Sequence, residues 1–158
     1  MKSRAPSAVR DERVEYVASN LLGHTAVLTR LLIRQVRPDV SRTEAGVLRT
    51  LTDAPRRITE LAELEGLAQP TMTLLVQRLE QRGWVERERH PDDGRVVLVS
   101  LTDTGRKTLE AFRAQVLAAL RSQLDAMPDE EIAELEAATE TLGSLVDALQ
   151  EPRLVTSN

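Results

Sequence analysis

The sequence predicts a mainly α-helical protein with one small β-hairpin. Hydrophobic residues recur every three or four positions along most of the 158-residue chain, which is the period of an amphipathic helix. Between Thr59 and Leu101 the pattern becomes a short helix, a tight turn, a longer helix and two β-forming runs joined by a turn. This order is typical of a winged helix-turn-helix, and the remaining helices are expected to flank it as dimerisation helices.

The N-terminal part is predicted to contain a flexible arm over residues 1–10 and a long helix over residues 11–36. The arm is polar, contains a proline and has no helical period. The helix carries a wide apolar stripe with spacings of three and four: Val14, Val17, Leu21, His24, Leu28 and Leu31. Such a stripe needs more partner surface than a helix-turn-helix offers, so we expect the helix to pack in a homodimer.

The winged helix-turn-helix is predicted over residues 41–101, and it is expected to begin with a bracing helix. Ser41 and Glu44 have the spacing of a capping box, in which a hydroxyl and a carboxylate satisfy free N–H groups at a helix start. Thr59 is predicted to cap the next, short helix. Gly66 is predicted to end it, since glycine readily adopts the left-handed backbone that follows many helices.

The longer helix of this unit is predicted over residues 70–81. Pro70 suits its first turn because proline lacks the N–H that would be unpaired there, and Gly83 follows its end. Helical spacing places on the inner face Met72, Leu75, Val76 and Leu79. The outward side is left with Gln69, Thr71, Thr73, Leu74, Gln77 and Arg78. In a helix-turn-helix, the second helix enters the major groove of DNA.

The β-forming runs over residues 84–89 and 95–101 predict a hairpin. Asp93 and Gly94 lie between the runs, and glycine tolerates the positive φ of a tight turn. Two interpretations of Arg95 remain open. On a narrow hairpin its guanidinium can enter a minor groove of DNA, where negative potential is concentrated. Alternatively, Arg95 and Asp93 pair with each other on a solvated turn.

Residues 103–150 are predicted to form further dimerisation helices, and residues 151–158 a C-terminal tail. Thr102 can cap a helix that runs to about Ala126, and Pro128 suits the first turn of a last helix. That last helix has an apolar seam and acidic outer faces. Packing of the two helices within one chain and packing between two chains both fit this pattern.

Composition argues against several functional classes. The chain has no Cys, which excludes disulfides, thiol redox sensing and cysteine metal ligands. Its two histidines, His24 and His90, are far apart, so no metal site is expected. There is no Gly-rich phosphate loop and no Ser/His/Asp arrangement, so we expect neither an enzyme nor a cofactor. Without a signal peptide or a membrane-spanning apolar run, a cytoplasmic location and no membrane partner are expected.

The net charge of −4 is unevenly distributed. Residues 129–158 hold eight acidic residues and one basic residue, a net charge of −7. Residues 1–128 hold 20 basic and 17 acidic residues, a net charge of +3. The acidic excess therefore lies away from the predicted helix-turn-helix, and we expect ordinary rather than high nonspecific affinity for DNA.

The segments ELAELEGLAQPTMTLLVQRLEQRGWVER and DDGRVVLVSLTDTG resemble the MarR family of bacterial transcriptional regulators. The resemblance extends over nearly the whole chain. Its most specific part is Asp93-x-Arg95, followed after five residues by Leu101-Thr102. It implies that Arg95 approaches the minor groove and that Asp93 orients basic residues of the wing. The helix residues implied to meet bases and phosphates are Gln69, Pro70, Thr71, Thr73, Leu74, Gln77 and Arg78.

Two positions depart from the family pattern. Leu74 stands where a basic residue is frequent, and Gly94 stands where Lys or Arg is common. Both departures lower the number of expected phosphate contacts.

The resemblance and the expected dimerisation helices together predict a transcriptional regulator that acts as a homodimer on a pseudo-palindromic operator in double-stranded DNA. Repression is preferred over activation, and both remain open. The resemblance also implies that a small aromatic or phenolic effector lodges between the dimerisation helices and the DNA-binding unit and releases the DNA. Candidate lining residues are His24, Leu28, Leu51, Arg106 and Leu109, each of which also fits plain core or helix surface. The alternative function is a helical protein–protein adaptor whose winged helix no longer reads DNA. Leu74 and the modest basic charge keep that alternative open.

Overall fold

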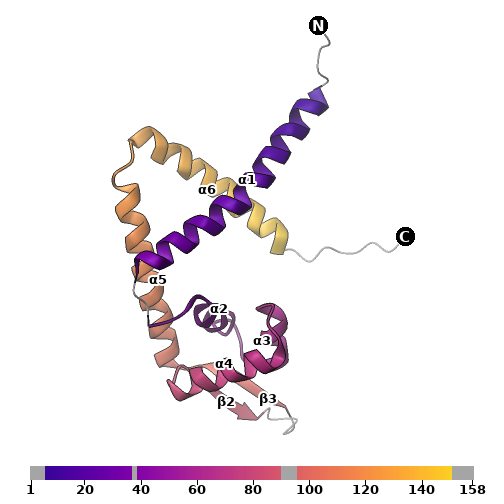
Figure 1. Ribbon diagram of the computed structural model, residues 1–158, viewed down its shortest axis with the longest axis vertical. Helices are drawn as coiled ribbons and strands as arrows, with labels where there is room; N and C mark the ends of the chain where they lie inside the picture. The colour runs from indigo at the N-terminus through magenta and orange to yellow at the C-terminus, as the bar shows by residue number, and fades with distance from the viewer. Residues whose placement is uncertain (1–5, 37–38, 90–95, 151–158) are drawn as a thin grey trace, which may run out of the picture. The chain divides into compact units, whose positions relative to one another are not determined.

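The computed structural model describes residues 6–36, 39–89 and 96–150 of the chain (Figure 1). The predicted fold class is confirmed, because these residues are mostly helical with one small antiparallel sheet. The elements in chain order are α1 (Pro6–Gln35), α2 (Arg42–Thr50), β1 (Arg56–Arg57), α3 (Ile58–Leu64), α4 (Gln69–Gln81), β2 (Val85–Arg89), β3 (Val97–Leu101), α5 (Asp103–Leu124) and α6 (Asp129–Gln150).

The chain divides into two compact units, residues 1–119 and residues 120–158. The core of the first unit lies among α2, α3, α4, the sheet and the start of α5. In Figure 1, α2, α3 and α4 gather beside the β2–β3 ribbon. Val47, Leu48, Leu61 and Val99 are fully buried there. One side of α4 packs against this core, and its other side is exposed to solvent.

Local capping determines where several of these helices begin and end. Ser41 and Glu44 form the predicted capping box: Glu44 N–H donates to Ser41 Oγ at 3.2 Å, and Ser41 N–H donates to Glu44 Oε2 at 2.7 Å. Gly66 and Gly83 follow α3 and α4 with φ of 64° and 70°, as predicted. In this left-handed region glycine avoids the steric cost that a Cβ would bring.

Two predicted helix starts were wrong. The short helix begins at Ile58, not after a Thr59 cap, and its N-cap residue is Arg57. Arg57 N–H donates to Glu60 Oε2 at 2.9 Å, and the extended backbone of β1 brings the chain directly into the helix. The first helix begins at Pro6, so residues 6–10 are helical rather than part of an arm. Proline is readily accommodated in the first turn of a helix.

The sheet has one strand more than the sequence predicts. Its order is β1-β3-β2, with β3 antiparallel to both neighbours. The predicted hairpin is formed by β2 and β3, with Arg89 paired to Val97 at its outer end and Val85 paired to Leu101 at its base. The additional strand, β1, has only two residues and pairs Arg56 with Val99.

The predicted cap at Thr102 joins the sheet to α5. Thr102 Oγ1 accepts a hydrogen bond from Gly105 N–H at 3.0 Å and donates one to Gly83 O at 2.6 Å. Thr102 N–H donates to Trp84 O at 3.1 Å. A Cβ at Gly105 would collide with Trp84 O and press on Leu101, so glycine is required for this close approach. The junction ties the end of α4, the ribbon and α5 together.

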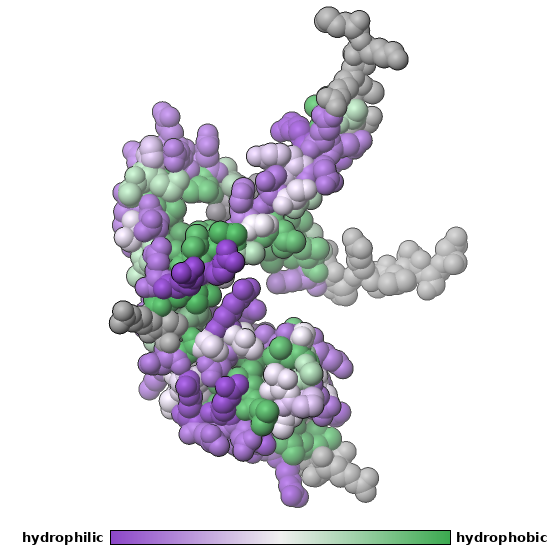
Figure 2. Space-filling view, in the orientation of Figure 1, coloured by the Kyte–Doolittle hydropathy of each residue, from purple (hydrophilic) through white to green (hydrophobic). Residues whose placement is uncertain are grey.

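Much apolar surface remains exposed on the long helices. On α1, Val14, Val17, Leu28 and Leu31 are each 46–54% exposed. None of the residues of α6 is buried. Figure 2 shows hydrophobic side chains at the surface of the long helices. Within the described ranges, no helix is long and apolar enough to cross a membrane.

Candidate nucleic-acid interface

Helix α4 separates its residues into a buried side and an exposed side. Met72, Leu75, Val76 and Leu79 are buried, which confirms the predicted inner face. The residues of α4 that are predicted to meet DNA are all exposed: Gln69, Pro70, Thr71, Thr73, Leu74, Gln77 and Arg78. The helix therefore presents a continuous outward surface along its whole length.

The N-terminus of α4 is open to an anion. Its N-cap residue is Ala68, whose side chain makes no capping hydrogen bond, and the first turn contains no acidic residue. The first N–H groups of a helix lack partners within the helix, and the helix dipole places partial positive charge there. This end is therefore suited to a phosphate oxygen.

Two arginines near the end of α4 have structural partners. Arg82 donates to Asp39 O at 2.9 Å, lies 3.7 Å from a carboxylate oxygen of Glu44 and stacks 4.6 Å from the Trp84 ring centroid. Arg87 of β2 forms a 2.7 Å ion pair with Glu80 of α4. These contacts fix the helix to the loop before α2 and to the ribbon.

Arg78 is left as the cation of the outward face of α4. Within the described part of the chain, its side chain forms no hydrogen bond or ion pair. The sheet adds Arg57, which is exposed on the edge strand β1 and which sequence reasoning did not single out. The Arg56-Arg57 pair before α3 was the available signal, but it lacked the apolar alternation of a strand.

The predicted wing residues Asp93 and Arg95 lie outside the described residues, as do His90 and Gly94. The described ends of β2 and β3 lead directly into this segment, with Arg89 exposed at the end of β2. A contact between the wing and DNA therefore rests on the sequence alone.

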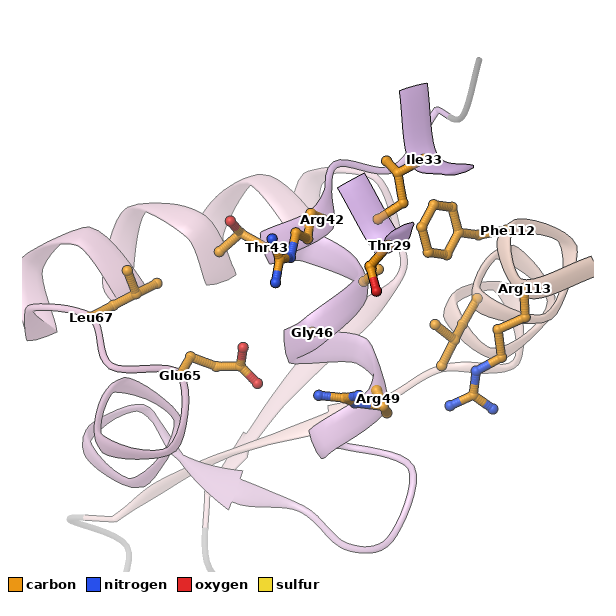
Figure 3. A pocket seen from close by; sticks show the side chains of 12 residues that line it. Thr29, Ile33, Arg42, Thr43, Gly46, Arg49, Glu65, Leu67, Phe112 and Arg113 are labelled. Carbon is orange, nitrogen blue, oxygen red and sulfur yellow. The ribbon is translucent and has the colours of Figure 1, made fainter. Parts of the chain in front are cut away.

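A cavity of about 750 Å³ lies within the first unit. Figure 3 shows the side chains that line it, which come from α1, α2, the segment after α3, and α5. They are Thr29, Ile33, Arg42, Thr43, Ala45, Gly46, Arg49, Glu65, Leu67, Leu109, Phe112 and Arg113.

The structure brings only one of the five predicted effector-binding residues to this cavity, namely Leu109. Leu51 is buried in the core, and His24, Leu28 and Arg106 are exposed positions outside the lining. Helix α2 lines the cavity through residues 42–49, whereas its C-cap residue, Leu51, is not part of the lining. Sequence periodicity identified the faces of each helix but did not give their mutual rotation.

The cavity combines cationic and apolar groups with one carboxylate. Arg42, Arg49 and Arg113 contribute guanidinium groups, and Phe112 contributes an aromatic ring. Glu65 Oε1 accepts a hydrogen bond from Thr50 Oγ1 at 2.8 Å. In Figure 3 the Glu65 carboxylate faces the backbone of α2 near Gly46.

Gly46 leaves the space that the Glu65 carboxylate occupies, because a Cβ there would lie 2.5 Å from Glu65 Oε2. Glu65 is the C-cap residue of α3 and stands four positions before the start of α4. The cavity therefore borders the turn of the helix-turn-helix.

Among the described residues, no group of three His, Asp or Glu side chains is arranged to hold a metal ion.

Comparison with known proteins places these features in a family. The model of the MarR family matches residues 40–97, which include α2, α3, α4 and β2. The chain is 31% identical over 119 residues to Mb0904 of Mycobacterium bovis, an uncharacterised HTH-type transcriptional regulator; the match covers 75% of this chain and 83% of the relative. It is 25% identical to the HTH-type regulator YpoP of Bacillus subtilis over 75% of this chain and 91% of the relative.

Solved structures of similar proteins have the same winged helix fold. Wild-type MarR from E. coli in its apo form is similar with a TM-score of 0.64 and 26% identity, over 78% of this chain and 95% of that chain. FabT of Streptococcus pneumoniae, solved in complex with DNA, has the same fold with a TM-score of 0.54 and 24% identity, over 88% of this chain and 99% of that chain. The protein therefore belongs to the MarR family of winged helix-turn-helix transcriptional regulators.

Proposed function

We propose that this protein is a sequence-specific repressor that places α4 in the major groove of double-stranded DNA. The observation that carries the proposal is the division of α4, with four buried apolar residues on one side and nine exposed residues on the other. Its open N-terminus offers N–H groups to a phosphate. The structure of FabT in complex with DNA shows that a protein of this fold binds DNA, which supports the placement.

We further propose that Arg78 and Arg57 neutralise phosphates and that the wing residue Arg95, oriented by Asp93, enters the minor groove. Phosphate contacts supply affinity and register, and base-edge contacts supply sequence preference. Because Arg82 and Arg87 have partners within the protein, we expect few phosphate contacts and a shallow dependence of affinity on salt.

We propose that the protein binds DNA as a homodimer. The support for this proposal is the half-exposed apolar stripe on α1, where Val14, Val17, Leu28 and Leu31 have little cover from their own chain. An exposed apolar surface of this extent typically marks a protein–protein interface, because burying it against a partner is favourable. Two-fold symmetry would place two α4 helices on half-sites about 10–10.5 bp apart.

The cavity is the proposed site of a small aromatic or phenolic effector. Its three guanidinium groups would pair with a carboxylate or phenolate, and the Phe112 ring and Leu109 would contact an aromatic ring. Glu65 lies between this cavity and α4, so occupancy would displace the turn that positions α4. An effector that binds better when α4 is displaced shifts the population away from the DNA-binding state.

Fluorescence anisotropy tests the DNA-binding function. The protein is titrated onto duplex DNA from upstream of its own gene and onto a scrambled duplex of equal length, at several salt concentrations. A specific regulator binds its operator about 10³-fold or more tightly than unrelated DNA. If no duplex binds specifically, including those recovered by selection from a random library, the DNA-reading function is overturned.

A second candidate function is a helical adaptor that pairs with another protein. The exposed Leu74 at the middle of α4 and the engagement of Arg82 and Arg87 favour it. Dimerisation without specific binding to any selected duplex would support the adaptor.

A further inference from the structure

Leu74 occupies the centre of the outward face of α4. Residues three and four positions apart are neighbours on a helix surface. For Leu74 these neighbours are Pro70, Thr71, Gln77 and Arg78, and all four are exposed. Leu74 itself is 61% exposed. A groove that accepts this face of α4 therefore contacts the leucine side chain.

The groups around Leu74 are neutral or cationic. The face has no acidic residue from Gln69 to Leu79, so it offers no carboxylate to accept a hydrogen bond from a cytosine amino group. Glu80 follows, but its carboxylate is held by Arg87 at 2.7 Å. Gln69 and Gln77 carry the amide group that pairs with the N6 and N7 atoms of adenine.

Thr73 adds a methyl group to the outward face of α4. Its Oγ1 donates to Gln69 O at 2.9 Å, so its hydroxyl proton is used within the helix. What Thr73 offers to a partner is its methyl group and a hydrogen-bond acceptor. The outward face therefore consists of aliphatic groups, amides and the hydroxyl groups of Thr71 and Thr73, and Arg78 is its guanine-reading or phosphate-binding cation.

Thymine supplies the apolar group of the major groove. The edges of the other bases present hydrogen-bond donors and acceptors there, whereas thymine adds its C5-methyl group. We propose that Leu74 contacts the C5-methyl of a thymine in each half-site, and that α4 reads a half-site with A·T pairs beneath its centre. This inference rests on the proposed DNA-reading function and assigns Leu74 as a specificity-determining residue of that site.

The expected loss of DNA affinity can be calculated from the burial of one thymine methyl group. Removing a methyl from a desolvated apolar contact lowers affinity by a factor of about four. Changing the equivalent thymine in both half-sites of a symmetric operator lowers it by more than about tenfold, since the two losses multiply.

Substitution of thymine by deoxyuridine tests the contact, because deoxyuridine keeps the base pair and lacks only the C5-methyl. Duplexes that bind the full-length protein are first selected from a random library. Each thymine of the selected half-site is then replaced, in symmetric pairs, and affinity is measured by fluorescence anisotropy. We expect a loss of more than about tenfold at one position or two adjacent positions of the half-site.

Leu74→Ala identifies the protein group responsible. This variant is expected to bind the thymine and deoxyuridine duplexes equally, because its shortened side chain no longer reaches the methyl. Leu64→Ala is the matched control, since Leu64 is a leucine of α3 that is 62% exposed. The control should keep the preference for thymine.

The possible failures are distinguishable. If no duplex is enriched, the DNA-reading function itself is overturned, and this inference with it. If duplexes are bound specifically but no thymine is sensitive to loss of its methyl, the contact is overturned and the function stands. If Leu74→Ala keeps the penalty for deoxyuridine, the effect belongs to the DNA or to another residue, and the assignment of Leu74 is overturned.

Discussion

Arg78 and Leu74 are neighbours on α4 with different proposed partners. Arg78 is a cation without a partner among the described residues, which suits a phosphate, while Leu74 is apolar and suits a base. A phosphate contact contributes almost equally on every DNA sequence, whereas a base contact contributes only on the correct one. The two residues can therefore be separated by measurement.

Arg78→Ala is expected to weaken binding to operator and scrambled duplexes by a similar factor. Each lost phosphate contact lowers the slope of log affinity against log salt by about 0.9. Anisotropy titrations between low and moderate salt measure both quantities. A selective loss on the operator with an unchanged slope would instead assign Arg78 to a base.

Gly105→Ala is expected to destabilise the fold by about 1–3 kcal/mol, the usual range for overpacking. The added Cβ would collide with Trp84 O, which is backbone and cannot move without disturbing the ribbon. Chemical denaturation measures the loss. Gly23→Ala is the control, because nothing lies within 4 Å of a Cβ there, and it should stabilise α1 by up to about 1 kcal/mol.

At the scale of elements, α2 links the DNA-binding unit to the cavity. Its buried residues include Val47 and Leu48 of the core, while its other side lines the cavity with Arg42 and Arg49. A stable start to this helix keeps both surfaces in place. That start depends on the capping box at Ser41, together with the contact between Glu44 and Arg82.

Ser41→Ala is expected to lower the free energy of unfolding by about 1 kcal/mol, the usual cost of losing a side-chain N-cap. The Glu44 N–H would lose its 3.2 Å acceptor. Ser19→Ala is the control, because Ser19 lies within α1 and donates only to an exposed Glu15. Equal stabilities of the two variants would show that the cap contributes nothing.

At the scale of the whole molecule, the proposed repressor needs two contacts that one chain does not supply. One is a partner for the apolar stripe of α1, and the other is a ligand for the cavity. Each can be tested without knowing the operator in advance, because dimerisation and effector binding have their own readouts.

Leu28→Asp is expected to convert the dimer to a monomer, because it places a charge in a desolvated apolar interface. Sedimentation equilibrium measures the mass. Ala26→Asp is the matched control, since Ala26 is exposed and lies on the opposite side of α1 from the stripe. A Leu28→Asp variant that remains dimeric would exclude α1 from the interface.

Benzoate is a suitable first probe of the cavity, since it joins an aromatic ring to a carboxylate. It is expected to release the protein from its operator, and Arg49→Ala should raise the concentration needed by about tenfold or more, the value of a charged hydrogen bond. Arg30→Ala is the control, because Arg30 is exposed on α1 and does not line the cavity. Identical titrations of both variants would exclude Arg49 from the effector site.

Features that depend on residues a few positions apart could be predicted from the sequence. The helical period separated the buried Met72 and Leu79 of α4 from its exposed residues, and local hydrogen bonding and backbone freedom marked the cap at Ser41 and the helix end at Gly66. Within a helix, packing and capping involve partners up to four positions away, so these features are visible in the sequence.

How the helices and strands meet could not be predicted from the sequence, because it depends on tertiary packing. The strand β1 has no apolar alternation of its own and exists because β3 offers it a partner. The cavity takes Arg49 from α2, Glu65 from the end of α3 and Arg113 from α5, a set fixed by the mutual rotation of three helices. Periodicity gives each helix its face but not its angle to a neighbour, because that angle is set by the packing of side chains far apart in the sequence.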